Sequence, residues 1–253
     1  MPIKTEELAG MTCEVVKVAG ANGDQIKAYV ARPATSNPVG TVVLINHAPG
    51  WDEWYWEATR RFAQHGFAAI CPNLYERNGD GTPEEVGARV REAGGVPDEQ
   101  VVGDVKGAAD YMKGQSYTNG KVAVYGSCSG GRHAFLTAGK LGKEIDAVVE
   151  CWPGGVIQAE ADLTPMRPVS PSSLTSNVTA SILGIFGNDD RNPTPEMANE
   201  HEEQLKAAGK DYEFHRYDGA GHGFFYYDRG AYRQEQAVDG WSKIWEWLPG
   251  KIG

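Results

Sequence analysis

Three residues with nucleophilic side chains, Ser127, Cys128 and Ser129, follow a short apolar run in the sequence VYGSCSGG. A nucleophile on a sharp strand-to-helix turn needs small residues two positions before it and two positions after it, because only these let the turn close against the sheet. Gly126 and Gly130 stand at those positions around Cys128. The spacing therefore predicts Cys128 as the nucleophile.

The two flanking serines fit such a turn less well. Centring the turn on Ser129 puts Ser127 and Gly131 at the small positions, which is sterically possible but lengthens the strand by one residue. Centring it on Ser127 fails, since Tyr125 would then occupy a small position. Ser129 stays open as an alternative nucleophile. The competing interpretation of Cys128 is a small buried residue, a common role of cysteine.

A cysteine nucleophile requires a base and a group that orients the base, and both appear later in the chain. Asp189 and Asp190 follow the apolar run SILGIFG, and His222 follows YEFHRYD within the glycine-rich GAGHGF. Taken singly, the aspartates suit a turn before Pro193, and the histidine suits a surface loop. Together, in the order nucleophile, acid, histidine, they predict a catalytic triad.

The predicted elements place these residues at strand ends. Strands are expected at residues 40–47, 67–74, 121–126, 146–152, 181–187 and 212–218. Helices are expected at residues 54–66, 98–114, 129–142, 195–209 and 232–248. Two further strands, 13–20 and 25–33, joined through Asn22-Gly23, predict an N-terminal antiparallel hairpin. The alternation predicts one α/β domain over 1–253, with a mostly parallel sheet covered by helices on both faces.

Two long segments, Glu76–Pro97 and Gly154–Thr179, show no clear element. Long insertions in such folds tend to lie over the active site, at the carboxyl ends of the strands. Plain surface loops are the other interpretation, and both stay open. Asp98 is expected to cap the helix that follows the first of these segments.

Composition limits the partners. The chain has 34 acidic and 24 basic residues and a formal net charge of -10. Such a surface repels the phosphates of nucleic acids and anionic lipids, so we expect neither nucleic acid nor membrane as a partner, and a small molecule as the substrate. The chain shows no secretory signal pattern and no apolar run of membrane-spanning length, which favours a cytoplasmic protein. The sequence leaves open whether it is a monomer or a homodimer.

Neither a metal nor a cofactor is indicated. The four cysteines lack the spacing of a metal site or a disulfide framework, which favours free thiols. The six histidines form no metal-binding motif, and no phosphate-binding loop is present. We therefore expect no cofactor and no metal.

The segments YTNGKVAVYGSCSGG, FGNDD and YDGAGHGF together resemble the dienelactone hydrolase family of α/β-hydrolases, whose cysteine turn has the pattern G-x-C-x-G-G. The similarity runs from about residue 13 to the end of the chain. It implies an α/β-hydrolase fold and the triad Cys128, Asp190 and His222. Asp190 is preferred to Asp189 because it stands three residues after Gly187, as the family pattern asks.

The resemblance also marks two departures. Family members that cleave dienelactone carry a glutamate where His47 stands and an arginine where Tyr226 stands, four residues after His222. A second arginine, which holds the substrate carboxylate in the family, corresponds to Arg89 or Arg91. The resemblance therefore implies an ester or lactone hydrolase without implying dienelactone as the substrate.

By the same resemblance, the backbone N–H groups of Ala48 and Ser129 would stabilise a tetrahedral oxyanion. The position of Ser129 at a helix start independently favours this role. Trp51 and Trp152 are expected to shape an apolar pocket, together with the residues at the two departing positions, His47 and Tyr226.

These observations predict a hydrolase that cleaves a small-molecule ester or lactone through an acyl-enzyme intermediate. A thioesterase or peptidase using the same triad is the alternative within enzymes. A ligand-binding protein that keeps the fold without catalysis is the alternative outside them.

Overall fold

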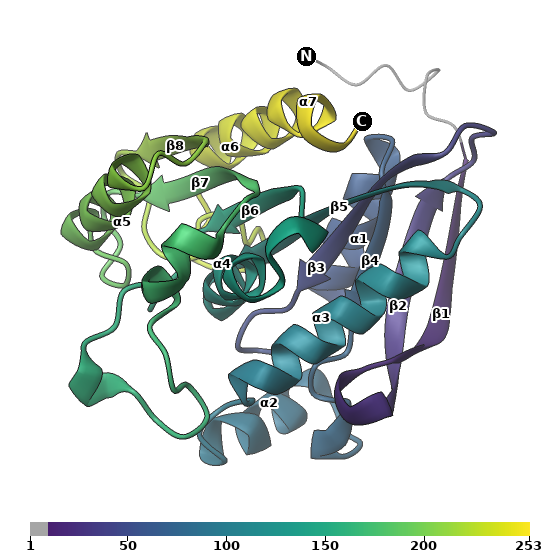
Figure 1. Ribbon diagram of the computed structural model, residues 1–253, viewed down its shortest axis with the longest axis horizontal. Helices are drawn as coiled ribbons and strands as arrows, with labels where there is room; N and C mark the ends of the chain where they lie inside the picture. The colour runs from purple at the N-terminus through teal and green to yellow at the C-terminus, as the bar shows by residue number, and fades with distance from the viewer. Residues whose placement is uncertain (1–9) are drawn as a thin grey trace.

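The structure, a computed structural model, describes residues 10–253 and is built on a single eight-stranded sheet (Figure 1). The strands lie in the order β1-β2-β4-β3-β5-β6-β7-β8. Their bounds are β1 Met11–Ala19, β2 Gln25–Pro33, β3 Val39–Ile45, β4 Ala68–Pro72, β5 Thr118–Ser127, β6 Ala147–Cys151, β7 Ser181–Gly187 and β8 Tyr212–Tyr217. Strands β3 to β8 are mutually parallel, and β1 and β2 form the antiparallel hairpin. The predicted fold class is confirmed.

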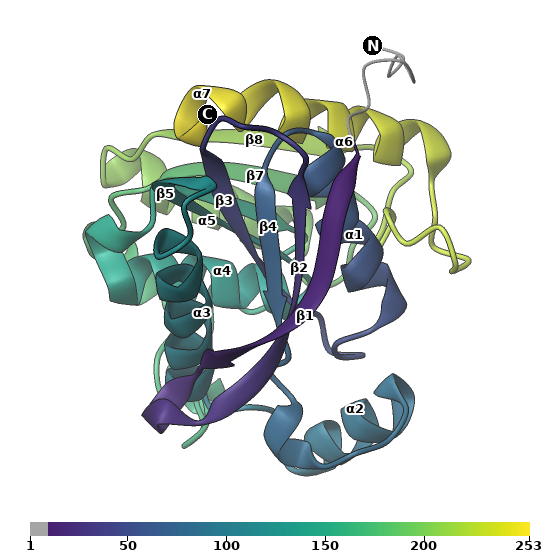
Figure 2. The same ribbon diagram turned by 90° about the vertical axis from the view of Figure 1, so that its right-hand side faces the viewer.

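Helices cover both faces of this sheet (Figures 1 and 2). Their bounds are α1 Glu53–Gln64, α2 Pro83–Glu92, α3 Asp98–Lys113, α4 Ser129–Leu141, α5 Pro195–Ala207, α6 Gln234–Trp247 and α7 Pro249–Ile252. Helices α3, α4 and α5 pack on one face, and α1 and α6 pack on the other. Within the described part of the chain, no helix is long and apolar enough to cross a membrane.

The sheet has this form because its central strands carry continuous runs of buried apolar residues. All of β4 and β6 is buried, as is nearly all of β3 and β7. Strands buried on both faces are typical of parallel sheets covered by helices. At the edge, Asn22 and Gly23 adopt positive φ angles of 58° and 79° in the turn between β1 and β2. These are conformations that asparagine and glycine tolerate best.

Helix α2 is the main difference from the predicted elements, because it lies inside the segment that showed no clear element. Its start is well specified: the Thr82 hydroxyl accepts from the backbone N–H of Glu85, the Glu85 carboxylate accepts from the N–H of Thr82, and Pro83 occupies the first turn. Only Gly87 and Val90 are buried in this helix. So few inward-facing apolar positions leave a weak periodic signal.

Asp98 does not cap α3 as predicted. Pro97 holds the cap position, and the Asp98 carboxylate instead accepts two hydrogen bonds from the Arg132 guanidinium, at 2.6 and 3.0 Å. Both side chains are almost completely buried. This ion pair joins α3 to α4, the helix that begins at the predicted nucleophile, and a buried carboxylate is stable only with such a partner.

Candidate active site

Cys128 lies at the sharp turn between β5 and α4, and its backbone is strained. Its φ is 56° and its ψ is -126°, a region that residues with a side chain rarely occupy. The turn leaves no room at its two glycines. A Cβ on Gly126 would strike the carbonyl of Gly130, and a Cβ on Gly130 would strike the carbonyl of Ile45. The turn is therefore centred on Cys128, as the spacing predicts.

Replacing Gly126 with alanine tests this turn. We expect the unfolding free energy to fall by about 1–3 kcal/mol, the usual cost of overpacking, because the added methyl meets backbone rather than a side chain that can move. Urea denaturation measures the loss. Gly250→Ala is the control, since no atom lies within 4 Å of its added Cβ. Equal stability of the two variants would contradict the steric argument.

The two serines beside Cys128 have different surroundings. Ser127 is fully buried, and its hydroxyl lies 2.9 Å from the Tyr55 hydroxyl and 2.8 Å from that of Tyr226. These contacts hold Ser127 inside the sheet layer. Ser129 is the first residue of α4, so its backbone N–H has no acceptor within the helix, and it donates to no other backbone group among residues 10–253.

Asp190 and His222 come together from the ends of two neighbouring strands. His222 Nδ1 lies 2.9 Å from Asp190 Oδ2, and the backbone N–H of Asn192 donates to Asp190 Oδ1 at 2.9 Å. The Asp190 side chain is buried, whereas the neighbouring Asp189 is exposed and contributes its backbone N–H to the carbonyl of Ala220. Of the two aspartates, Asp190 is thus the one that orients the imidazole.

The surroundings of His222 favour its protonated form. Burial alone would lower the pKa of His222, but the Asp190 carboxylate at its Nδ1 and, after it, the Cys128 sulfur raise that pKa to about 10. The imidazole therefore favours its charged form. At neutral pH it carries a proton that it can donate.

This raised pKa has a consequence for stability. A group whose folded-state pKa is raised from 6.5 to about 10 stabilises the fold fully below 6.5, and that contribution is lost as the pH rises toward 10. We expect the difference in unfolding free energy between wild type and His222→Gln to shrink across this range. Urea denaturation at several pH values measures it. A difference that grew with pH would contradict the direction of the shift.

A cavity of about 210 Å³ opens at the carboxyl ends of β3, β4 and β5, and its wall includes Ser129, the residue after Cys128. Cys128, Asp190 and His222 themselves are not among its lining residues. Two of its lining residues are Ala48 and Ser129, the predicted sources of oxyanion-binding N–H groups. The hydroxyl of Tyr75 donates to the carbonyls of Ala48, at 3.2 Å, and His47, at 3.4 Å, and so holds the loop that carries the Ala48 N–H. The other lining residues are Asn46, Leu74, Tyr75, Val90, Arg91, Gly94, Gly95, Val96, Val101, His133 and Arg167.

Comparison with known proteins identifies the family of the chain. A model of the dienelactone hydrolase family matches residues 26–251 of the chain. The chain belongs to this family. Its members are hydrolases of carboxylic esters, and so is this protein.

Individual relatives agree with that assignment. The chain is 32% identical over 242 residues to a provisionally named carboxymethylenebutenolidase of Methylorubrum extorquens, covering 94% of this chain and 81% of the relative. A provisionally named 2-oxo-3-(5-oxofuran-2-ylidene)propanoate lactonase of Bradyrhizobium is 26% identical, over 88% of each chain. The structure resembles that of a provisionally assigned dienelactone hydrolase from Klebsiella pneumoniae with a TM-score of 0.86 at 27% identity, covering 95% of this chain and 99% of the other.

At the two positions where the sequence departs from the dienelactone hydrolase pattern, the side chains are buried and do not line the cavity. Burial lowers the pKa of His47, whose Nε2 lies 2.6 Å from Asp52 Oδ2. The rings of Trp54, Tyr55 and Tyr226 surround this imidazole at 5.0 to 6.0 Å. Both departing residues thus belong to one aromatic cluster under the site.

The two tryptophans expected in the pocket also lie elsewhere. Trp152 is fully buried behind the catalytic histidine candidate, its ring 6.4 Å from that of His222. Trp51 lines a second cavity, also of about 210 Å³, on the far side of Tyr75. Trp152 therefore supports the imidazole rather than forming a wall of the first cavity.

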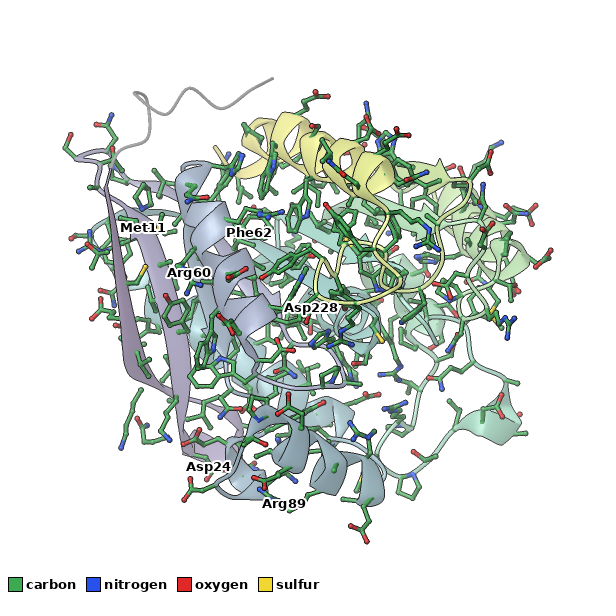
Figure 3. The ribbon with its side chains drawn as sticks, turned by 180° about the vertical axis from the view of Figure 1, so that it is seen from behind. Met11, Asp24, Arg60, Phe62, Arg89 and Asp228 are labelled. Carbon is green, nitrogen blue, oxygen red and sulfur yellow. The ribbon has the colours of Figure 1, made fainter. Side chains whose placement is uncertain are left out.

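The structure separates the two candidate arginines on α2. Arg91 lines the cavity, whereas Arg89 donates to the backbone carbonyls of Asn78 and Asp80 at the outer rim of the molecule (Figure 3). Sequence reasoning missed His133 and Arg167. The signal for His133 was available, since it stands five residues after Cys128 on the helix that begins at Ser129, but Arg167 lies in an irregular segment that carries no such signal.

Residues 10–253 contain no group of three or more histidine, cysteine or acidic side chains that could hold a metal ion.

Proposed function

We propose that the protein hydrolyses a small ester or lactone through a thioester formed on Cys128, with His222 and Asp190 completing a catalytic triad. The strained backbone of Cys128 between two glycines that tolerate no side chain carries this proposal. Such strain is retained where it serves a purpose, and presenting a nucleophile at the start of a helix is one.

In the first step, the Cys128 sulfur attacks the carbonyl carbon as a thiolate, beside the protonated His222. The carbonyl oxygen becomes an oxyanion that accepts hydrogen bonds from the N–H groups of Ala48 and Ser129. When the carbon–oxygen bond to the leaving group breaks, His222 donates its proton to the departing alkoxide. The acyl group remains on sulfur as a thioester, and an alcohol is released.

In the second step, a water molecule attacks the thioester, and His222, now neutral, takes one of its protons. The carbon–sulfur bond breaks, and the Cys128 thiolate and the carboxylic acid are formed beside a protonated His222. Asp190 holds the imidazole in the orientation that both transfers need. For a lactone, the alcohol and the acid belong to one product molecule.

The size of the cavity supports a small substrate. A volume of about 210 Å³ lies below the range of about 300–1,000 Å³ typical of sites for drug-sized ligands. The relatives named as butenolidases and lactonases act on small molecules of this kind by name. A small ester or lactone is accordingly the proposed substrate class.

Intact-protein mass spectrometry tests the proposal directly. Wild type and Cys128→Ala are treated with p-nitrophenyl acetate and, separately, with iodoacetamide. With p-nitrophenyl acetate we expect a single acetyl adduct on wild type and none on the variant. With iodoacetamide the exposed Cys13 reacts in both proteins, so we expect one more carbamidomethyl group on wild type than on the variant. Acetylation that persists in Cys128→Ala would move the nucleophile to Ser129 or another residue. An unmodified wild type would favour a ligand-binding protein without catalysis, and faster turnover of thioesters than of oxygen esters would favour a thioesterase.

A further inference from the structure

One part of the cavity wall carries buried polar atoms without a hydrogen-bond partner in the described structure. These are both ring nitrogens of His133, the side-chain oxygen of Asn46 and Nε of Arg167. All three residues line the cavity of about 210 Å³ that Ala48 and Ser129 also line. A buried polar atom left unpaired destabilises the protein, because it has given up its hydrogen bonds to water. A ligand group that pairs with these atoms would remove that destabilisation when it binds.

Among residues 10–253, no group forms a hydrogen bond with either ring nitrogen of His133. Its nearest acidic neighbour is Asp98, and Nε2 of His133 lies 3.6 Å from Asp98 Oδ1, beyond hydrogen-bond distance. Both oxygens of Asp98 already accept from Arg132. Even if Nε2 moved closer to Asp98, Nδ1 would remain without a partner.

The protonation state of His133 decides which hydrogen bonds this part of the cavity wall can donate and accept. Burial lowers the pKa of His133, so its imidazole is neutral at neutral pH and offers one donor and one acceptor. Asn46 donates through Nδ2 to the carbonyl of His47 at 3.0 Å, which leaves its oxygen as an acceptor. Two acceptors therefore face the ligand together with donors on His133 and Arg167.

A carboxylate of the ligand can only accept, so it would leave the two acceptors of this wall unpaired. A hydroxyl group both donates and accepts and matches the wall. We propose that Asn46 and His133 bind a hydroxyl group on the acyl part of the substrate. This inference rests on the proposed function, because the acyl group occupies this cavity only if its carbonyl oxygen lies at the N–H groups of Ala48 and Ser129.

The chemical class of substrate is then a hydroxy-substituted ester or lactone. Kinetics with methyl butanoate, methyl 3-hydroxybutanoate and monomethyl succinate test this assignment. We expect wild type to favour the hydroxy ester over methyl butanoate by at least about tenfold in kcat/KM, because a site built to bind a hydroxyl rejects the analogue that lacks it. A ratio near one in wild type would overturn the inference.

Variants assign the preference to the wall. In His133→Leu the ratio is expected to approach one, and in His133→Gln, which keeps a donor and an acceptor, part of the preference is expected to remain. Thr137→Val is the matched control, because Thr137 is buried on the same helix with an unpaired hydroxyl among the described residues but does not line the cavity. A preference that survived in His133→Leu would contradict the assignment. The assignment would also be contradicted if wild type preferred monomethyl succinate to methyl 3-hydroxybutanoate and Arg167→Gln alone abolished that preference.

Binding to Cys128→Ala separates this inference from the proposed function. Isothermal titration of this variant with the hydroxy ester and with methyl butanoate reports recognition without turnover. Tighter binding of the hydroxy ester than of methyl butanoate supports the hydroxyl site if the difference is lost in the double variant that also carries His133→Leu. This support holds even if wild type hydrolyses no ester. A lack of hydrolysis would then defeat only the proposed function. Hydrolysis of all three esters by wild type without any discrimination, together with equal binding, would defeat only the inference.

Discussion

Cys128→Ala is expected to lower kcat/KM for ester hydrolysis by roughly 10⁵-fold, because removing the nucleophile of a triad leaves only binding and oxyanion stabilisation. Steady-state hydrolysis of p-nitrophenyl acetate measures the loss. The thermal midpoint of unfolding is expected to change little, since Cys128 is only partly buried and alanine introduces no larger group.

Ser129→Ala is the matched control for this prediction. The proposed contribution of Ser129 is its backbone N–H, which alanine keeps, so we expect most of the activity to remain. Activity lost in Ser129→Ala and kept in Cys128→Ala would place the nucleophile at Ser129. That result would contradict both the strained backbone of Cys128 and the absence of room at Gly126 and Gly130.

The second large effect is expected from Asp190→Asn, with a loss of roughly 10³- to 10⁴-fold in kcat, because an amide no longer fixes the imidazole in the required tautomer. The same change removes the carboxylate that raises the pKa of His222 toward 10. Histidine NMR should therefore show His222 titrating at lower pH in the variant. Steady-state kinetics and this titration give two independent readouts.

Asp189→Asn provides the control for Asp190. Its side chain is exposed, whereas that of Asp190 is buried and hydrogen-bonded to His222. We expect near wild-type kinetics and an unchanged His222 titration. A strong loss in Asp189→Asn with a mild one in Asp190→Asn would show that the chosen aspartate is wrong.

The turn at Cys128, the sheet and the strand ends that carry Asp190 and His222 could be predicted from the sequence, because each depends on residues that are close together in the chain. The turn around Cys128 needs small residues at fixed spacing, and the chain supplies Gly126 and Gly130 there. The alternation of buried strands and helices predicted the sheet and its covering layers, since each element must bury one kind of face. Strand ends located Asp190 and His222, because the ends of parallel strands share one edge of the sheet.

Other features were settled only by the packing of segments far apart in the chain. Tyr226 and Trp152 are aromatic residues of the kind that commonly line pockets. Both are buried instead, because neighbouring rings and the Ser127 hydroxyl surround them. Helix α2 was missed because it has few inward-facing apolar positions.

The walls of the cavity depended most on tertiary structure. Asn46 follows β3, His133 lies on α4, and Arg167 lies in an irregular segment, and no spacing in the sequence relates the three. The fold class and the position of the strained turn at Cys128 could be predicted from the amino-acid order alone, because backbone sterics and the burial of apolar faces act over a few neighbouring residues. Which polar side chains line the cavity depends on the tertiary structure, because a cavity wall is assembled from distant segments whose side-chain directions are set by packing.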